Sequence, residues 1–264
     1  MNAFDLSGRR ALVTGGAQGL GEGMARALAA AGATVVIADV KTDAAEAVAT
    51  SLGSGHGVVT LDVTDDDNWA SAIDSATQQL GGLDLVVNNA GVEISSLMTE
   101  LAADDVRRQL DVNVLGTALG IKHALRTMRP GGAAGQGGVV INVASVAATI
   151  AFPGIAIYSA TKSAIDRMTR VAAMEAGKLN YGVRVNCIYP GLVPTEMGAG
   201  LASDMAELGL FGSTEEAVEA VVGLTPSGRL GEVTDMADAV VFLASDAARF
   251  VNGAGLPVDG GMGM

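Results

Sequence analysis

The chain reads Ala11-Leu12-Val13-Thr14-Gly15-Gly16-Ala17-Gln18-Gly19-Leu20-Gly21 close to its N-terminus, and a helical pattern follows at once. Ala11-Leu12-Val13 is a short apolar run of the kind that forms a buried strand. Glycines at 15, 19 and 21 allow a tight turn and a close approach to a ligand, and the helix that follows presents free N–H groups to an anion. The stretch therefore predicts a strand, a phosphate-binding turn and a helix, with a ligand-free turn as the alternative.

Short β-branched runs alternate with longer alanine-rich stretches along the rest of the chain. The expected strands are 11–13, 34–37, 57–59, 83–87, 139–143, 183–186 and 256–258. The expected helices are 19–32, 42–52, 66–80, 101–128, 157–178, 214–223 and 234–245. This alternation is typical of βαβ units, and strands rich in Val, Ile and Leu indicate helices on both faces. The prediction is an α/β fold, a Rossmann-like doubly wound parallel sheet of seven strands.

No composition shift or long polar linker divides residues 1–264, so we expect one domain that both binds the dinucleotide and carries the catalytic residues. Residues 195–225 are less regular, with apolar side chains at uneven spacing. An irregular segment of this length inside a compact domain often forms a lid or a binding loop. We therefore expect a substrate lid at about 195–225.

Composition limits what the chain can bind. A net charge of −13 repels phosphate backbones and anionic lipids, so neither nucleic acid nor a membrane is an expected partner. His56 and His123 match no metal-ligand spacing, so no metal is expected. Cys187 is the only cysteine, which excludes an internal disulfide and fits a reducing compartment. The chain shows no secretory signal and no apolar run of ~20 residues, and we expect a cytoplasmic location.

Asp39 ends the second predicted strand, eighteen residues after Gly21. That spacing is near the one expected for an acid that binds the adenosine ribose, with a strand-end or capping acid as the alternative. A carboxylate repels a 2′-phosphate and Val40 follows it, so NAD is favoured over NADP, although Lys41 could reach a phosphate. The ends of the third and fourth strands supply further expected contacts: Asp62, Val63, Asn89, Ala90 and Gly91.

Tyr158 and Lys162 form a Tyr-x-x-x-Lys pair in a predicted helix, where residues four apart share one face. A phenol ordinarily has a pKa near ~10, too high for a base at neutral pH. A cation ~4 Å away, at an effective dielectric of ~20, favours the phenolate by about 4 kcal/mol and would lower the tyrosine pKa by about two to three. The pair predicts a proton-transferring tyrosine, with a surface tyrosine beside a solvated lysine as the alternative.

Together these motifs resemble the short-chain dehydrogenase/reductase family in its compact single-domain branch, over about residues 5–261. The residues that carry the resemblance are Thr14, Gly15, Gly19, Gly21, Asp39, Asp62, Asn88-Asn89-Ala90-Gly91, Asn113, Ser145, Tyr158, Lys162, Pro190-Gly191-Leu192-Val193-Pro194-Thr195, Val251-Asn252-Gly253 and Val258-Asp259-Gly260-Gly261. The resemblance implies hydride transfer between a nicotinamide dinucleotide and a small-molecule alcohol or ketone.

The resemblance also implies roles for four catalytic residues: Asn113, Ser145, Tyr158 and Lys162. Tyr158 would be the base in alcohol oxidation and the acid in ketone reduction, and Lys162 would lower its pKa and bind the nicotinamide ribose. Ser145 would donate to the substrate oxygen, and Asn113 would hold a water on a proton path from Lys162. NAD would be bound by Gly15, Gln18, Gly19, Leu20, Gly21, Asp39, Val40, Asp62, Val63, Asn89, Ala90, Gly91, Tyr158, Lys162, Pro190, Gly191, Val193 and Thr195.

Apolar residues after the fourth and fifth strands and in 195–225 predict an apolar pocket. The expected substrate contacts are Ser145, Ala147, Phe152, Ile155, Tyr158, Met197 and Leu201, with Ile94, Ser95, Leu208 and Phe211 as further candidates. Glu93 is a polar exception that contacts substrate or faces solvent, and solvent is favoured. The expected substrate is a largely apolar secondary alcohol or ketone of alicyclic, aryl or steroid-like form.

Two other functions are compatible with parts of the pattern. One is an NADPH-dependent ketoacyl-type reductase, against which Asp39 argues. The other is a non-catalytic dinucleotide-binding regulator, against which the complete set of four catalytic positions argues. Family members usually assemble as tetramers through the helices around 101–128 and 157–178 and the C-terminal strand, so the resemblance implies a homotetramer.

Overall fold

The computed structural model describes residues 3–264; residues 1–2, which begin the expected domain, lie outside the described part. One sheet runs through the molecule in the order β3-β2-β1-β4-β5-β6-β7, and every neighbouring pair is parallel. Its strands are β1 (Arg10–Thr14), β2 (Thr34–Asp39), β3 (Gly57–Thr60), β4 (Leu85–Asn88), β5 (Gly138–Val143), β6 (Val183–Pro190) and β7 (Gly255–Val258). The predicted seven-stranded, doubly wound Rossmann-like fold is confirmed.

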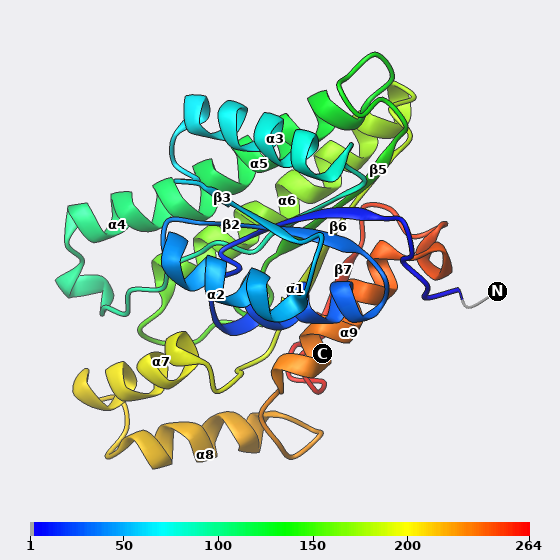
Figure 1. Cartoon of the computed structure of the whole chain (residues 1–264). Coiled ribbons are helices and arrows are strands. Elements are labelled where there is room, and N and C mark those ends of the chain that lie inside the picture. Colours follow the sequence, from blue (N-terminus) through cyan, green and yellow to red (C-terminus); the bar gives the residue numbers. More distant parts are fainter. Residues whose placement is uncertain (1–2) are drawn as a thin grey trace.

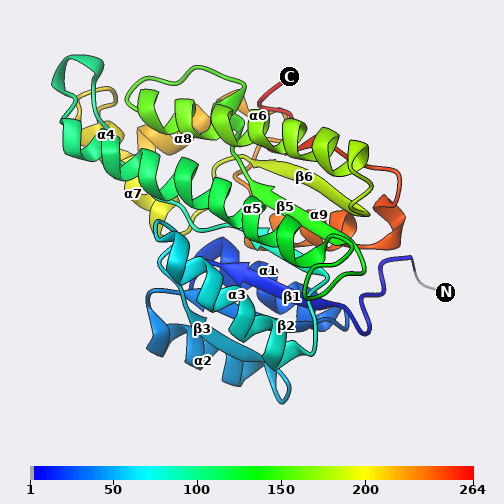
Figure 2. The same ribbon diagram turned by 90° about the horizontal axis from the view of Figure 1, so that it is seen from above.

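Helices cover both faces of the sheet (Figures 1 and 2). One face carries α1 (Gly19–Ala30), α2 (Thr42–Leu52) and α9 (Val233–Ala244). The other carries α3 (Asp66–Leu80), α5 (Gly116–Met128) and α6 (Ala156–Lys178). Short 3-10 turns lie at Met98–Glu100, Val146–Ala148 and Asp246–Ala248.

Two apolar cores explain why the strands are apolar almost without interruption. Val13 packs with α1 and α9, whereas the preceding Leu12 packs on the opposite face with Trp69, and none of these three side chains is exposed. Successive residues of a strand point to opposite faces, so a strand covered on both sides needs apolar residues at every position. The Trp69 indole N–H donates to the carbonyl of Val63 at 3.0 Å, which satisfies its polar atom inside the core.

The single helix expected over 101–128 is divided into three parts. α4 (Ala103–Gln109) leads into a π-helical segment, Leu110–Leu115, before α5 begins. Asn113 lies in that segment and is wholly buried. A π-turn inserts an extra residue into the helix and is frequent at functional sites. Local periodicity does not distinguish such a turn from an ordinary helix.

Residues 195–225 are more regular than expected. They contain α7 (Glu196–Glu207) and α8 (Thr214–Leu224). Both begin at hydroxyl N-caps: the Thr195 hydroxyl accepts from the Gly198 N–H at 3.3 Å, and the Ser213 hydroxyl accepts from the Glu216 N–H at 3.2 Å. The two helices pack against each other and against the segment after β5, in a small apolar cluster that includes Ala147, Ile155, Ala202, Met205 and Ala217.

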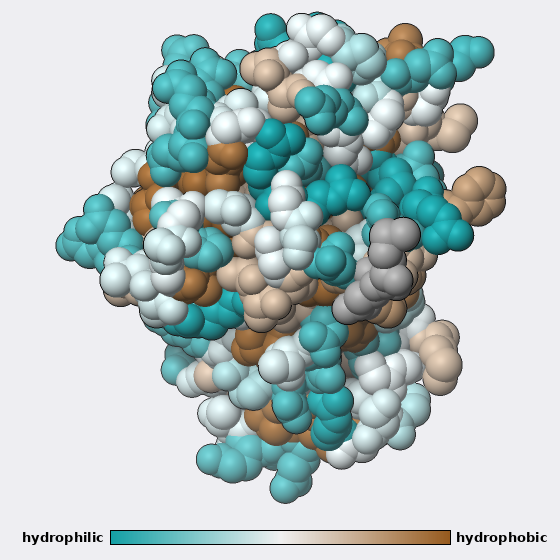
Figure 3. Space-filling model, turned by 45° about the vertical axis from the view of Figure 1, so that its right-hand side comes forward, coloured by the Kyte–Doolittle hydropathy of each residue, from teal (hydrophilic) through white to brown (hydrophobic). Residues whose placement is uncertain are grey.

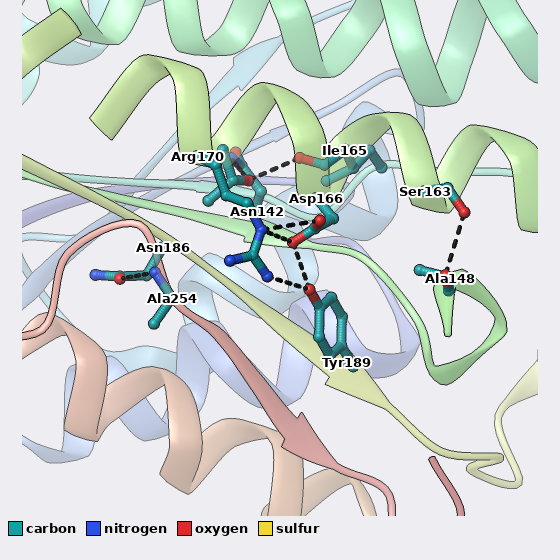
Figure 4. Close-up of polar contacts among 10 residues, drawn as sticks. Asn142, Ala148, Ser163, Ile165, Asp166, Arg170, Asn186, Tyr189 and Ala254 are labelled. Carbon is teal, nitrogen blue, oxygen red and sulfur yellow. Dashed lines mark hydrogen bonds and ion pairs between the residues drawn. The ribbon is translucent and has the colours of Figure 1, made fainter. Parts of the chain in front are cut away.

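Polar contacts hold α6 against its neighbours (Figure 4). Asp166 forms an ion pair with Arg170 at 2.9 Å and accepts a hydrogen bond from the hydroxyl of Tyr189 on β6. The Ser163 hydroxyl donates to the carbonyl of Ala148 at 3.3 Å. These contacts fix the N-terminal half of α6 relative to the ends of β5 and β6.

Figure 3 shows one face on which hydrophilic residues and residues of intermediate hydropathy surround smaller hydrophobic areas. Among residues 3–264, no helix is both long and apolar enough to cross a membrane.

Candidate active site

A cavity of about 620 Å³ lies beyond the carboxyl ends of the strands. Its walls come from the segments that follow β1, β2, β3, β4, β5 and β6, and from α6, α7 and α8. β1 lies between β2 and β4, so the chain winds outward in opposite directions from this point. Open α/β sheets bind their ligands at such a reversal of strand order.

The glycine turn after β1 leaves room that side chains would fill. A Cβ on Gly15 (φ +62°) would lie 2.9 Å from the Cα of Ala90, and one on Gly21 would collide with the carbonyl of Gly15. The Thr14 hydroxyl accepts from the N–H groups of Asn89 and Ala90 at 3.0 and 3.1 Å, which ties the end of β4 to this turn. The backbone on both sides can therefore approach a ligand closely.

The first turn of α1 has no side-chain cap. The Gln18 side chain, at the capping position, instead accepts from Lys41 Nζ at 2.8 Å and donates to Glu196 at 3.0 Å. Uncapped N–H groups at a helix start are suited to a phosphate. The turn and the helix together therefore fit the pyrophosphate of a dinucleotide.

Asp39 lies at the cavity wall at the end of β2 and is 9% exposed. Its two carboxylate oxygens accept from the N–H of Ala17 at 3.1 Å and from the N–H of Lys41 at 2.9 Å. Each oxygen keeps a further lone pair, so the fixed carboxylate can still accept from ribose hydroxyls.

Ser145 and Tyr158 line the same cavity, and the Ser145 hydroxyl is close enough to lower the pKa of Tyr158. Ser145 follows β5, and its hydroxyl accepts from the N–H of Ala147 at 3.1 Å. Lys162, one turn along α6 from Tyr158, donates from Nζ to the carbonyl of Val143 at 2.9 Å. α6 and the end of β5 thus bring three of the four predicted catalytic side chains to one wall.

Asn113 does not line the cavity but lies behind it. Its side chain accepts from the N–H of Val92 and donates to the carbonyl of Val92, both at 2.8 Å, and donates to the Thr161 hydroxyl at 3.1 Å. The π-helical segment therefore fixes the loop after β4 against α6. Thr161 and the carbonyl of Val143 are partners that the sequence motifs did not indicate, because neither follows from spacing along the chain.

The titration of Tyr158 differs from the sequence prediction. Burial raises its pKa to about 12, the hydrogen bond from Ser145 lowers it, and the charge of Glu93 raises it. Burial likewise lowers the pKa of Lys162 to about 8. Nζ of Lys162 lies 5.4 Å from the centre of the Tyr158 ring and is engaged with Val143. The expected lowering of the Tyr158 pKa is therefore wrong: burial raises that pKa, and Lys162 is not among the groups that shift it.

Most predicted contact residues line the cavity. They are Gly15, Gln18, Gly19, Leu20, Asp39, Val40, Asp62, Val63, Asn89, Ala90, Gly91, Ser145, Ala147, Phe152, Ile155, Tyr158, Lys162, Pro190, Gly191, Val193, Thr195, Met197 and Leu201. Gly21 lies beneath the turn, and the further candidates Ile94, Ser95, Leu208 and Phe211 are not in the wall. Phe211 instead stacks on Phe152, with ring centres 6.3 Å apart.

Several wall residues were not predicted. Glu93, for which solvent was favoured, is half-buried in the cavity wall, which corrects that expectation. Val221 of α8 reaches the wall because α8 packs on α7. The other wall residues outside the predicted contacts are Lys41, Leu61, Val92, Arg108, Val112, Val143, Ala144, Val146, Ile150, Leu192, Glu196, Gly198 and Met262. Residues 3–264 contain no group of three or more His, Cys, Asp or Glu side chains that could hold a metal.

The fold and the cavity define a class, the nicotinamide-dinucleotide oxidoreductases built on a single doubly wound sheet. The enoyl-(acyl carrier protein) reductase model of that class matches residues 15–263. Two curated relatives are similar over nearly their whole length. Trans-4-hydroxycyclohexanecarboxylate dehydrogenase of Sinomonas cyclohexanicum is 36% identical over 95% of this chain and 91% of its own. The 3-alpha-(or 20-beta)-hydroxysteroid dehydrogenase of Mycobacterium tuberculosis is 37% identical over 97% of this chain and 90% of its own.

Two solved structures agree closely with the fold. Gluconate 5-dehydrogenase from Burkholderia cenocepacia, in complex with NADP and tartrate, has a TM-score of 0.87 at 34% identity, covering 99% of this chain and 97% of its own. The 3-ketoacyl-(acyl-carrier-protein) reductase from Brucella melitensis, complexed with NADH, has a TM-score of 0.87 at 32% identity. The match covers 98% of this chain and 100% of that chain. The chain belongs to the short-chain dehydrogenase/reductase family, whose members transfer a hydride between a nicotinamide dinucleotide and their substrate.

Proposed function

We propose that this protein oxidises a largely apolar secondary alcohol, of alicyclic, aryl or steroid-like form, with NAD, and reduces the corresponding ketone. The observation that carries the proposal is that Ser145 and Tyr158 lie in one cavity wall with Phe152, Ile155 and Leu201. Apolar side chains of this kind can bind a hydrocarbon ring, while the hydroxyls of Ser145 and Tyr158 are available to the oxygen atom at the reacting carbon. The alicyclic and steroid substrates in the names of the two curated relatives support the same class.

Each catalytic side chain has a distinct part in this proposal. Tyr158 takes the proton of the alcohol during oxidation and returns it to the ketone oxygen during reduction. Ser145 donates a hydrogen bond to that oxygen and stabilises the charge that develops on it. The bound nicotinamide supplies the hydride acceptor or donor. Lys162 orients the nicotinamide ribose, and Asn113 holds the loop after β4; a proton path from Lys162 through Asn113 remains a prediction.

The choice of NAD rests on Asp39, whose carboxylate would repel a 2′-phosphate. Lys41 is engaged with Gln18 at 2.8 Å, which weakens the case for it as a phosphate ligand. The fold itself accommodates both cofactors, since one structural neighbour holds NADP and another NADH. We expect kcat/KM for NAD to exceed that for NADP by about tenfold or more, because an unfavourable charge contact costs about 1–3 kcal/mol.

The test is a screen of cyclic, aryl and steroidal alcohols with each dinucleotide, read by the absorbance of the reduced nicotinamide. Turnover of neutral ring alcohols with NAD supports the proposal. A tenfold preference for NADP, or turnover confined to acyl-carrier substrates, favours the ketoacyl-type reductase instead. Dinucleotide binding without turnover of any alcohol or ketone favours a regulator.

We also propose a homotetramer in the cytoplasm. Val171 and Met174 of α6 are 49% and 74% exposed, and apolar side chains on an outer helix are suited to a subunit interface. Cys187 is a free, buried thiol, as is usual in a reducing compartment. Light scattering after size exclusion tests the assembly: a mass of four chains supports it, and a monomer refutes it.

A further inference from the structure

Glu93 has an unusual position for a carboxyl group. It follows β4 and lines the cavity that also holds Ser145 and Tyr158. The Ser95 hydroxyl donates to its Oε1 at 2.8 Å, which fixes the side chain. Among residues 3–264, Oε2 of Glu93 has no hydrogen-bond partner and Glu93 forms no ion pair. A partly dehydrated acceptor without a partner is costly, so a donor on the substrate would be favoured there.

The charged groups around Glu93 come from three elements. Asp204 of α7 adds a second negative charge, and Tyr158 of α6 is close enough for Glu93 to influence its titration. Arg108 of α4 lines the same cavity, but it is exposed and forms no ion pair with Glu93. Lys162 is engaged with Val143. A substrate carboxylate placed beside Glu93 would therefore meet the negative charges of Glu93 and Asp204, neither of which is paired with a cation within residues 3–264.

We propose, on the basis of the function proposed above, that Glu93 selects the substrate by charge. Its free oxygen accepts a hydrogen bond from a second hydroxyl on a neutral alcohol, and its negative charge excludes alcohols that carry a carboxylate. In this respect the protein would differ from its relative named for hydroxycyclohexanecarboxylate, despite 36% identity.

Charge selection by Glu93 should depend on pH. Burial and the charge of Asp204 raise the pKa of Glu93 to about 7. Below that pH the side chain is neutral and tolerates a carboxylate nearby, and above it the two charges repel. The preference for a neutral over an anionic alcohol should therefore grow as the pH rises through about 7. Taking the ratio of the activities with the two alcohols cancels any effect of pH on Tyr158, because proton transfer to Tyr158 is common to both substrates.

The experiment compares cyclohexanol, its ring-matched diol and 4-hydroxycyclohexanecarboxylate under saturating NAD. The wild type should prefer the diol to the carboxylate by about tenfold at alkaline pH, with a smaller ratio at acid pH. In Glu93→Gln the preference for the diol over the carboxylate should no longer vary with pH, because the amide carries no charge. At alkaline pH this preference should be about tenfold lower than in the wild type. Glu93→Ala should in addition lose the preference for the diol over cyclohexanol. Glu100→Gln, an exposed acid in the same segment, should behave as the wild type.

A wild type that oxidises the carboxylate as well as the diol would overturn the proposal, as would a Glu93→Gln profile equal to that of Glu100→Gln. Failure to oxidise cyclohexanol or the diol would count against the proposed function. In that case charge selection is tested by calorimetric binding of the two ketones that correspond to the diol and to 4-hydroxycyclohexanecarboxylate, which are a hydroxyketone and a keto acid. Preferential binding of the hydroxyketone, lost in Glu93→Gln, supports it, and equal binding contradicts it.

Discussion

Burial governs the ionisable side chains that α6 brings to the cavity. A buried phenolate loses hydration, which raises the pKa of Tyr158 to about 12, and a buried ammonium loses hydration as well, which lowers the pKa of Lys162 to about 8. Tyr158 therefore holds its proton at neutral pH and can donate it to a ketone. In the direction of oxidation it has to lose that proton first.

Tyr158→Phe removes the hydroxyl and leaves the ring. We expect kcat to fall by about a thousandfold, within the range of lost acid–base catalysis, while the dinucleotide Kd changes by less than about twofold. Stopped-flow turnover and calorimetric titration measure the two quantities. Tyr181→Phe is the control, because Tyr181 lies outside the cavity wall. Substantial turnover by Tyr158→Phe would exclude this tyrosine as the proton-transferring group.

Ser145→Ala should change the pH profile as well as the rate. The hydrogen bond from Ser145 lowers the Tyr158 pKa, so its loss should raise that pKa further. Because oxidation needs the deprotonated phenol, kcat/KM for alcohol should rise with pH in the wild type, and this rise should move to higher pH in the variant. A profile measured with one alcohol at saturating NAD tests this, and an unchanged or lower midpoint would contradict it.

α7 and α8 both begin at side-chain N-caps and both contribute residues to the cavity wall. They contribute Met197, Leu201 and Val221 to the cavity wall and are anchored mainly by a small apolar cluster. Their position over the cavity supports the proposal of a lid, because a segment with few buried apolar contacts opens more readily than the main core.

Ser213→Ala tests this element. Loss of the N-cap of α8 should cost about 1 kcal/mol of local helix stability and raise KM for the alcohol several-fold, with kcat nearly unchanged. Asp65→Ala is the matched control, since Asp65 caps α3 by accepting from the Asn68 N–H at 2.9 Å and lies outside the cavity wall. Equal effects of the two variants on KM would indicate that α8 has no part in binding.

At the scale of the whole molecule, the two apolar cores hold the strand ends that form the site. Ile141 on β5 is wholly buried in the core beneath α1 and α9, four residues before Ser145. The apolar packing of β5 therefore supports both the sheet and the position of the catalytic serine.

Ile141→Ala should reduce the free energy of unfolding by about 2–5 kcal/mol, whereas Ile141→Val should reduce it by about 0.5–1.5 kcal/mol. The difference reflects the cavity that the smaller side chain leaves. Urea unfolding at a fixed protein concentration measures both, since subunit assembly also contributes to stability. A loss below about 1 kcal/mol for Ile141→Ala would show that the core collapses around the site.

The sheet, its winding and the ligand-binding end were accessible from the residues alone, because each rests on a local pattern. Apolar runs such as Val139-Val140-Ile141 indicate a strand covered on both faces, and Gly15 and Gly21 indicate close backbone approach. The spacing of Tyr158 and Lys162 likewise placed them on one face of α6.

Other features depend on groups that are distant along the chain. The hydration of Tyr158 is set by α7, α8 and the segment after β5, so the direction of its pKa shift was not accessible from its neighbour at position 162. Asn113, in the π-helical segment, is hydrogen-bonded to Val92 and Thr161, which are far from it along the chain. The position of Glu93 in the wall depends on the packing of the loop after β4. Burial and long-range hydrogen bonds are properties of the assembled molecule, and these set the chemistry of the site on a scaffold that local periodicity already encodes.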